Sequence, residues 1–248
     1  NLASLYQAMG QYAQALPLYQ RALDISEKTL GPEHPDTGRS LNNLAMMYRA
    51  IGQYTQALPL LQRALAIREK INGLEHPESV TLLNNLAGLY KAMGQYAQAL
   101  PLLQRTLATN EKTQGSDHPD TGRGLNNLAL TYQAMGQYAL ALPLLQRALA
   151  ISEKTLGSEH PDTGTQLNNL ATLYQALGEY AQALPLLQRG LAIRERANGP
   201  EHPDTGGSLS NLASLYQDMG EYAQALPLYQ RALAISEKTL GSEHPDTG

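Results

Sequence analysis

Six histidines are the residues of this sequence whose type and spacing could perform chemistry. Each is followed by proline, and they recur at even intervals: His34, His76, His118, His160, His202 and His244. Imidazole nitrogens bind metal ions and carry protons near neutral pH. Such a row is therefore a set of metal ligands, a chain of proton carriers or six copies of one loop, and the fold decides among them.

Most other ingredients of catalysis are missing from the sequence. The 248 residues include no cysteine, which excludes disulfides, thiolate nucleophiles and cysteine-ligated zinc. Glycines stand singly at predicted helix ends rather than in a phosphate-binding loop. No serine lies in a nucleophile elbow. We therefore expect a protein that is not an enzyme and that holds no metal and no cofactor.

Composition also limits the classes of partner that we expect. The net charge is −4, so the chain lacks the positive field that holds a nucleic-acid backbone. No apolar run approaches the roughly 18 residues that cross a bilayer. We expect no nucleic-acid partner, no membrane contact and, by default, a cytoplasmic location.

The histidines are positioned by a tandem repeat. Segments begin at asparagines that recur every 42 residues, as from 43 to 85, without insertion or deletion. The predicted repeats are 1–42, 43–84, 85–126, 127–168, 169–210 and 211–248. Equal spacing through every loop implies that each repeat meets the next in the same way. We predict one array over residues 1–248, a solenoid truncated at both ends.

Each repeat contains two predicted helices. Apolar residues at helical spacing run from Thr37 to about Ala50, with Asp36 where an N-cap belongs. A second stripe runs from Tyr54 to Ile67 and ends before Asn72 and Gly73. Because few residues separate the helices, they form an antiparallel hairpin. Pro59 lies early in the second helix and predicts a slight kink there or a later helix start.

The residues of one repeat resemble a known family. The matching order in the second repeat is Leu44, Ala45, Tyr48, Gly52, Tyr54, Ala57, Leu61 and Ala64. It resembles the tetratricopeptide repeat (TPR), with alanine where the first helix commonly has glycine. The "LNNLA" start and the "GxEHPD" loop are similar to the 42-residue repeats of kinesin light chains. The resemblance covers the whole chain and implies an all-α fold, a right-handed α-solenoid of antiparallel helix-turn-helix units.

The solenoid answers the histidine question. Two nitrogens that each lie about 2.0 to 2.1 Å from one zinc ion are within about 4 Å of each other. Neighbouring repeats are offset by at least about 8 to 10 Å, the helix-packing distance. One histidine per repeat therefore makes a ladder and not a metal site. We interpret the motif as a loop in which aspartate caps the next helix and histidine packs or hydrogen-bonds in the turn.

A second face of the first helix varies between repeats. Residues three, seven and ten positions apart share a helix face, and Arg39, Asn42, Met46 and Arg49 form one. In the family that the chain resembles, the first helices line a concave surface that holds extended peptides, and paired asparagines reach the peptide backbone. An amide suits this role because it offers donors and an acceptor together. The alternative is that these asparagines tie adjacent repeats together or face water.

The predicted function is a protein–protein interaction module with a peptide in its concave groove. The candidate peptide-binding residues are Arg39, Asn42, Asn43, Met46, Arg49, Asn84, Asn85, Lys91, Arg123, Asn126, Asn127, Leu130, Gln133, Asn168, Asn169 and Gln175. The four cations among them favour an acidic ligand. The alternative is a structural spacer or assembly scaffold without a ligand, which the near identity of the repeats favours.

The repeat pattern also predicts self-association. The first repeat lacks residues equivalent to 37–42, and the sequence stops at Gly248 where another first helix would begin, so we expect apolar surface at both ends. Molecules should then stack end to end through a contact that does not close. Light scattering should show a mass that rises with protein concentration. A constant monomer mass at millimolar concentration would contradict this expectation.

Overall fold

The computed structural model describes residues 2–73 and 75–240, which form helices and connecting turns. The helices are α1 (Leu2–Ala8), α2 (Tyr12–Thr29), α3 (Pro35–Ala50), α4 (Tyr54–Asn72), α5 (Pro77–Ala92), α6 (Tyr96–Gln114), α7 (Pro119–Ala134), α8 (Tyr138–Thr155), α9 (Pro161–Ala176), α10 (Tyr180–Asn198), α11 (Pro203–Asp218) and α12 (Tyr222–Leu240). They belong to two compact units, an N-terminal unit (Asn1–Thr113) and a C-terminal unit (Gln114–Gly248). Each is described by itself.

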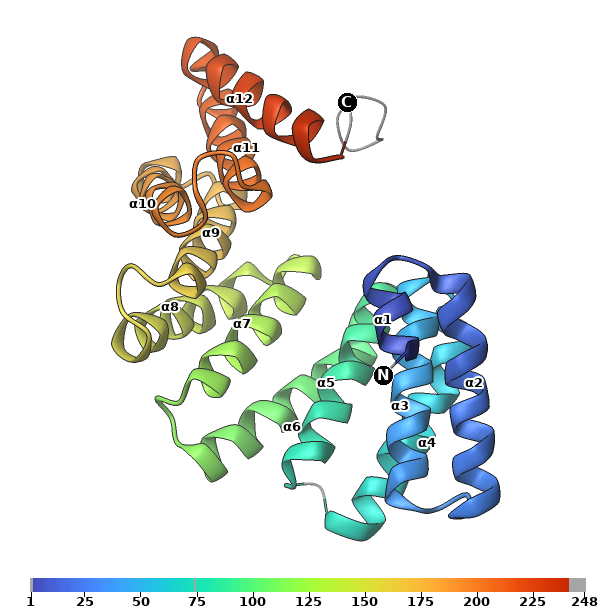
Figure 1. Ribbon diagram of the computed structural model, residues 1–248. Coiled ribbons are helices and arrows are strands. Elements are labelled where there is room, and N and C mark those ends of the chain that lie inside the picture. The colour runs from blue at the N-terminus through green and yellow to red at the C-terminus, as the bar shows by residue number, and fades with distance from the viewer. Residues whose placement is uncertain (1, 74, 241–248) are drawn as a thin grey trace. The chain divides into compact units, whose positions relative to one another are not determined.

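Within each unit, successive helices pack as antiparallel hairpins (Figure 1). The turn between α3 and α4 depends on Gly52, whose φ of 74° lies in the left-handed region that side chains disfavour. The N–H of Gln53 donates to the carbonyl oxygen of Tyr48 over 2.9 Å and closes the end of α3. Ala45, Ala57 and Ala64 are fully buried. Fully buried side chains this small allow the backbones of the packed helices to approach closely.

The second helix of the hairpin begins where its apolar stripe begins. Helix α4 starts at Tyr54 and continues through Pro59, so the alternative of a later start is wrong. A proline in a helix removes one backbone hydrogen bond. Ala57 and Leu61 flank Pro59 and are both fully buried. Core packing on either side of the proline therefore outweighs the missing bond.

The first helices begin earlier than predicted, and the predicted cap is wrong. Helix α3 starts at Pro35 and its N-cap is His34, whose Nδ1 accepts a hydrogen bond from the Asp36 N–H over 3.1 Å. Proline suits the first helical position because its φ is already helical and the missing N–H would be unpaired there. The imidazole then performs the task of a short polar cap. Asp36 lies in the first turn, where its carboxylate faces the positive end of the helix.

The same cap recurs in both units. In the described part of the chain, the capping histidines are His34, His76, His118, His160 and His202. A cap of this kind needs Nδ1 unprotonated, so each ring has a structural role in its own loop. His244 lies outside the described residues. Among residues 2–73 and 75–240, no three histidine, cysteine or acidic side chains come together as a group that could hold a metal ion.

The cap assignment predicts the effect of one substitution. His118→Ala should lower the free energy of unfolding by about 1 kcal/mol, as loss of an N-cap acceptor does. His118→Asn keeps a short acceptor and should recover most of that loss. Urea denaturation of the full chain measures both. Equal losses in the two variants would show that ring packing, and not the hydrogen bond to the Asp120 N–H, gives His118 its role.

Candidate first-helix binding faces and the second-helix arginines

In the N-terminal unit, an amide pair joins two successive first helices. The Asn85 side-chain nitrogen on α5 donates to the side-chain oxygen of Asn42 on α3 over 2.9 Å. Both residues are half-buried, whereas Asn43 beside them is exposed. Of the adjacent asparagines Asn42 and Asn43, Asn42 is thus used to hold neighbouring repeats together. This is the alternative role that the sequence left open.

The C-terminal unit repeats this contact. The Asn169 side-chain nitrogen on α9 donates to the side-chain oxygen of Asn126 on α7 over 2.8 Å. Asn168 donates in turn to the hydroxyl oxygen of Ser208 on α11 over 3.1 Å. Asn127 is half-buried on α7. The first helices of this unit are therefore connected by a line of amide and hydroxyl bonds.

Two of the four predicted cations already have acidic partners. Arg39 lies 2.9 Å from the Asp36 carboxylate, and Arg123 pairs with Asp120 in the same way, three residues earlier on its helix. All four side chains have substantial exposure, so each pair is screened by water and adds little to stability. These pairs also cancel much of the positive charge that the sequence suggested for this face.

The other two cations, Arg49 and Lys91, lie together without such partners. Gly88 on α5 lets the Arg49 side chain from α3 come close, because a Cβ at Gly88 would lie 3.3 Å from a guanidinium nitrogen. Burial lowers the pKa of Lys91, and the neighbouring Arg49 charge lowers it further. Within the described residues, neither cation has an acidic partner. They form a cationic pair on the N-terminal unit.

The remaining candidates have mixed surroundings. Met46 and Leu130 are half-buried. The side-chain oxygens of Asn84 and Gln133 are buried and have no hydrogen-bond partner in the structure. Each of these two oxygens therefore has unused acceptor capacity.

Gln175 is already engaged at the far side of the C-terminal unit. Its side-chain nitrogen lies 2.6 Å from an Asp218 carboxylate oxygen and 3.1 Å from the Ser214 hydroxyl oxygen on α11. The variable face of α9 is therefore bonded to that of α11. Asp218 gives this end of the face an acidic character that α3 and α5 do not share.

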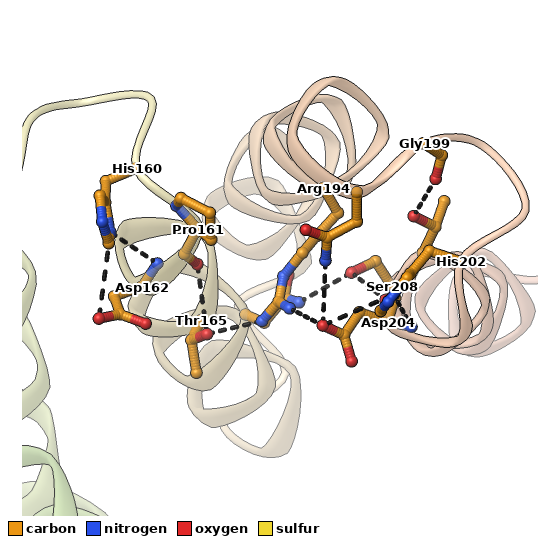
Figure 2. Close-up of polar contacts among 12 residues, drawn as sticks. His160, Pro161, Asp162, Thr165, Arg194, Gly199, His202, Asp204 and Ser208 are labelled. Carbon is orange, nitrogen blue, oxygen red and sulfur yellow. Dashed lines mark hydrogen bonds and ion pairs between the residues drawn. The ribbon is translucent and has the colours of Figure 1, made fainter.

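Sequence reasoning missed a pair of arginines on the second helices. The side chain of Arg68 is 7% exposed; it lies 2.6 Å from the Glu78 carboxylate and donates to the carbonyl oxygen of Pro35 over 3.0 Å. Arg194 in the C-terminal unit lies 2.7 Å from Asp204 and donates to the Thr165 hydroxyl oxygen over 2.6 Å (Figure 2). Each arginine bridges three helices.

A signal for these arginines exists in the sequence. The equivalent positions read Ser26, Arg68, Asn110, Ser152, Arg194 and Ser236, in a helix whose other inward positions barely change. Where serine replaces arginine, the space stays open. A cavity of about 350 Å³ lies at Ser152, against about 150 Å³ beside Arg68. Residue differences between the second helices of the repeats therefore indicate candidate sites as well as differences between the first helices do.

No helix in residues 2–73 or 75–240 is long and apolar enough to cross a membrane.

The stacked hairpins and their amide-linked first helices define a helical repeat protein, and comparisons identify its family. The tetratricopeptide repeat model matches residues 1–70, 78–154, 122–196, 162–238 and 204–248. The chain belongs to the tetratricopeptide repeat family. It is thus a protein–protein interaction module in the general sense that this family defines.

Solved structures of repeat proteins are also similar to this chain. The chain is similar to nearly identical TPR-like repeats assigned to a kinesin light chain of Podosopora anserina, with 38% identity, a TM-score of 0.70 and coverage of 84% of this chain and 98% of that one. BtubC (BKLC) from P. vanneervenii has 21% identity and a TM-score of 0.74, with coverage of 96% and 93%. The apo form of RapI has 15% identity and a TM-score of 0.71, with 95% of each chain covered. The latter two show the fold alone. A comparison with curated proteins found no match.

The amide pairs predict a difference between equivalent asparagines. Asn169→Ala should lower the free energy of unfolding by about 1 kcal/mol, since the Asn126 oxygen loses its donor. Asn43→Ala is the matched control, because Asn43 has the same place in its repeat but is exposed. It should change stability by less than about 0.5 kcal/mol. Urea denaturation measures both, and equal effects would contradict the assigned role.

Proposed function

We propose that the chain binds an extended, acidic segment of a partner protein on the first-helix face of its N-terminal unit. The observation that supports this most is the cationic pair of Arg49 and Lys91, which lacks an acidic partner in the described residues. Two neighbouring like charges repel each other, and partial burial adds a desolvation cost. A carboxylate placed between them relieves both effects.

The two cations suit different parts of such a ligand. The Arg49 guanidinium offers a planar fork that matches a carboxylate with two parallel hydrogen bonds, whereas the Lys91 ammonium acts as a point charge. Met46 lies one turn before Arg49 on the same helix and supplies apolar contact. The face thus combines charge with an apolar surface, as interaction sites commonly do.

A backbone contact is available next to the charges. Asn84 and Lys91 lie seven residues apart on α5 and share a face. The buried Asn84 oxygen has no partner in the structure, and a peptide N–H would satisfy it. An extended peptide presents such N–H groups at regular intervals, so a carboxylate on Lys91 and a backbone bond to Asn84 are compatible.

The C-terminal unit carries a candidate face of its own, which is more polar. Its members are Arg123, Asn126, Asn127, Leu130, Gln133, Asn168, Asn169 and Gln175. The side-chain oxygens of Gln133 and Asn168 have no hydrogen-bond partner in the structure, and Asn168 is the counterpart there of Asn84. We propose that this face contacts ligand backbone and adds little charge selectivity, because Arg123 is paired with Asp120.

The alternative function is a spacer or assembly scaffold. It is supported by exposed apolar side chains on α1, where Leu2 and Leu5 are 56% and 57% exposed, and on α12, where Leu226 is 59% exposed. End-to-end association through these helices belongs to this second proposal. The cytoplasmic location and the division into six repeats also remain proposals, and both rest on the sequence.

Peptide binding tests the first proposal. On an array of acidic, neutral and basic 12-residue peptides, the chain should prefer acidic ones, and the affinity should fall with added salt. Arg49→Gln and Lys91→Gln should each weaken binding about tenfold, the effect of about 1.4 kcal/mol. Lys28→Gln makes the same charge change at the exposed end of α2 and should leave affinity unchanged.

The sign of the Lys91 pKa shift gives a folding control. Because the folded state lowers this pKa, folding disfavours the charged side chain at pH values below its ordinary pKa. Lys91→Gln should therefore be at least as stable as the parent chain. Weak, equal signals for all peptides with the parent chain would favour the scaffold alternative.

A further inference from the structure

The acidic residue near the start of each first helix has a cation beside it, with one exception. Asp36 and Asp120 pair with an arginine three residues later, Arg39 or Arg123. Glu78 and Asp204 pair instead with an arginine ten residues earlier, Arg68 or Arg194 on the preceding second helix. These two arrangements account for four of the five such acids in the described residues.

The exception is Asp162 in the C-terminal unit. Thr165 stands where Asp36 and Asp120 have an arginine, and Ser152 stands where Glu78 and Asp204 have one. The Asp162 carboxylate is 63% exposed and lies 4.0 Å from His160 Nδ1, which is a cation only when protonated (Figure 2). In the described residues, Asp162 therefore has neither of the arginines that its counterparts have.

The space of the missing arginine is open. The cavity of about 350 Å³ lies between α7, α8 and α9, and its walls include Pro119, Asn126, Ser152 and Asp162. The Ser152 hydroxyl is only 2.9 Å from the Thr163 hydroxyl, so it turns toward α9 and does not fill the space. Around Arg68, the equivalent wall residues enclose about 150 Å³.

A residue of the cavity wall also has an unsatisfied acceptor. Gln166 lines it and is only 8% exposed, yet its side-chain oxygen has no hydrogen-bond partner in the structure. The equivalent residue beside Arg68 is Leu82, which needs no donor. A buried amide oxygen without a donor is destabilising, because it has lost its bond to water. The occupant that satisfies it must bring an N–H or O–H group.

The positive charge of Arg123 in the cavity wall does not prevent a cationic ligand from binding there. Arg123 lines the cavity but is paired with Asp120. The N-terminal unit shows the same neighbourhood occupied, because Arg39 and Arg68 line one cavity while Arg39 pairs with Asp36. Two guanidinium groups thus share this space when each has its own carboxylate.

We propose that the cavity between α7, α8 and α9 binds the guanidinium of an arginine side chain that a partner protein inserts. The fork would lie on the Asp162 carboxylate, as those of Arg68 and Arg194 lie on Glu78 and Asp204, and a further N–H would donate to the Gln166 oxygen. Guanidinium fits this set better than ammonium because it is planar and carries five donors in fixed directions.

The open space at Ser26 shows that volume alone does not make an arginine-binding site. It measures about 390 Å³ and is lined by Asp36, Arg39 and Ser40. There the Asp36 carboxylate is already paired with Arg39, and Ser26 bonds to the Ser40 hydroxyl over 2.9 Å. Among the described residues that line this space, none supplies an unpaired carboxylate or an unsatisfied acceptor, so we assign no arginine to it.

Titration with N-acetyl-arginine amide tests the inference, with N-acetyl-lysine amide as the second probe. The arginine probe should bind the full chain with a roughly millimolar Kd and shift the side-chain amide NMR signals of Gln166. Asp162→Asn and Gln166→Leu should each weaken binding at least fivefold. The lysine probe should bind at least fivefold more weakly than the arginine probe.

Ser152→Arg supplies the decisive variant. It restores the arginine found in two other repeats, so it should fold, and it should abolish probe binding by filling the cavity. Ser236→Arg makes the same substitution on α12 and should bind the probe like the parent chain. Unchanged binding by Ser152→Arg, or no Gln166 shift with the parent chain, would overturn the proposal. Because Arg49 and Lys91 are not involved, this result is independent of the acidic-peptide proposal.

Discussion

The close approach of helices at fully buried alanines is the constraint on which the rest of the structure depends. Ala45, Ala57 and Ala64 are fully buried, and their counterparts Ala129, Ala141 and Ala148 are buried to within 1% in the C-terminal unit. With the hairpin spacing fixed in this way, side chains at equivalent positions meet equivalent neighbours. A change at one position then alters a site without altering the frame around it.

Charge placement follows from that frame. Helices α3, α5, α7, α9 and α11 each begin with a histidine cap, proline and an acid, so a carboxylate stands at the positive end of each of these helices. Cations come from two alternative positions, and the chain uses one or the other in most repeats. The functional features that we propose are two departures within residues 2–73 and 75–240: Arg49 and Lys91 are cations without an acidic partner, and Asp162 is an acid without an arginine partner. In our proposals, a binding partner supplies the opposite charge at each of these positions.

Much of the fold was predictable from the sequence because strict periodicity leaves few arrangements. The antiparallel hairpins are confirmed, and the family assignment is confirmed by its matches. The cap was wrong because aspartate is the commoner N-cap, and only the geometry of His34 and Pro35 shows that imidazole takes that place. The amide pairs were weighed only as an alternative, since helix periodicity gives a face but not the partner across it. Arg68 and Arg194 were missed because a long polar side chain on an inward position reads as a surface residue until its carboxylate is located.

The central claim is that equivalent positions in different repeats have equivalent neighbours. A side chain transferred between repeats should then keep its contacts. A crystal structure of the Ser152→Arg variant tests this most directly. The account predicts that the introduced guanidinium lies on the Asp162 carboxylate within hydrogen-bonding distance, in the pose that Arg194 adopts on Asp204. A guanidinium turned out to solvent, with the cavity still open and Asp162 unpaired, would contradict the shared frame and the inferences drawn from it.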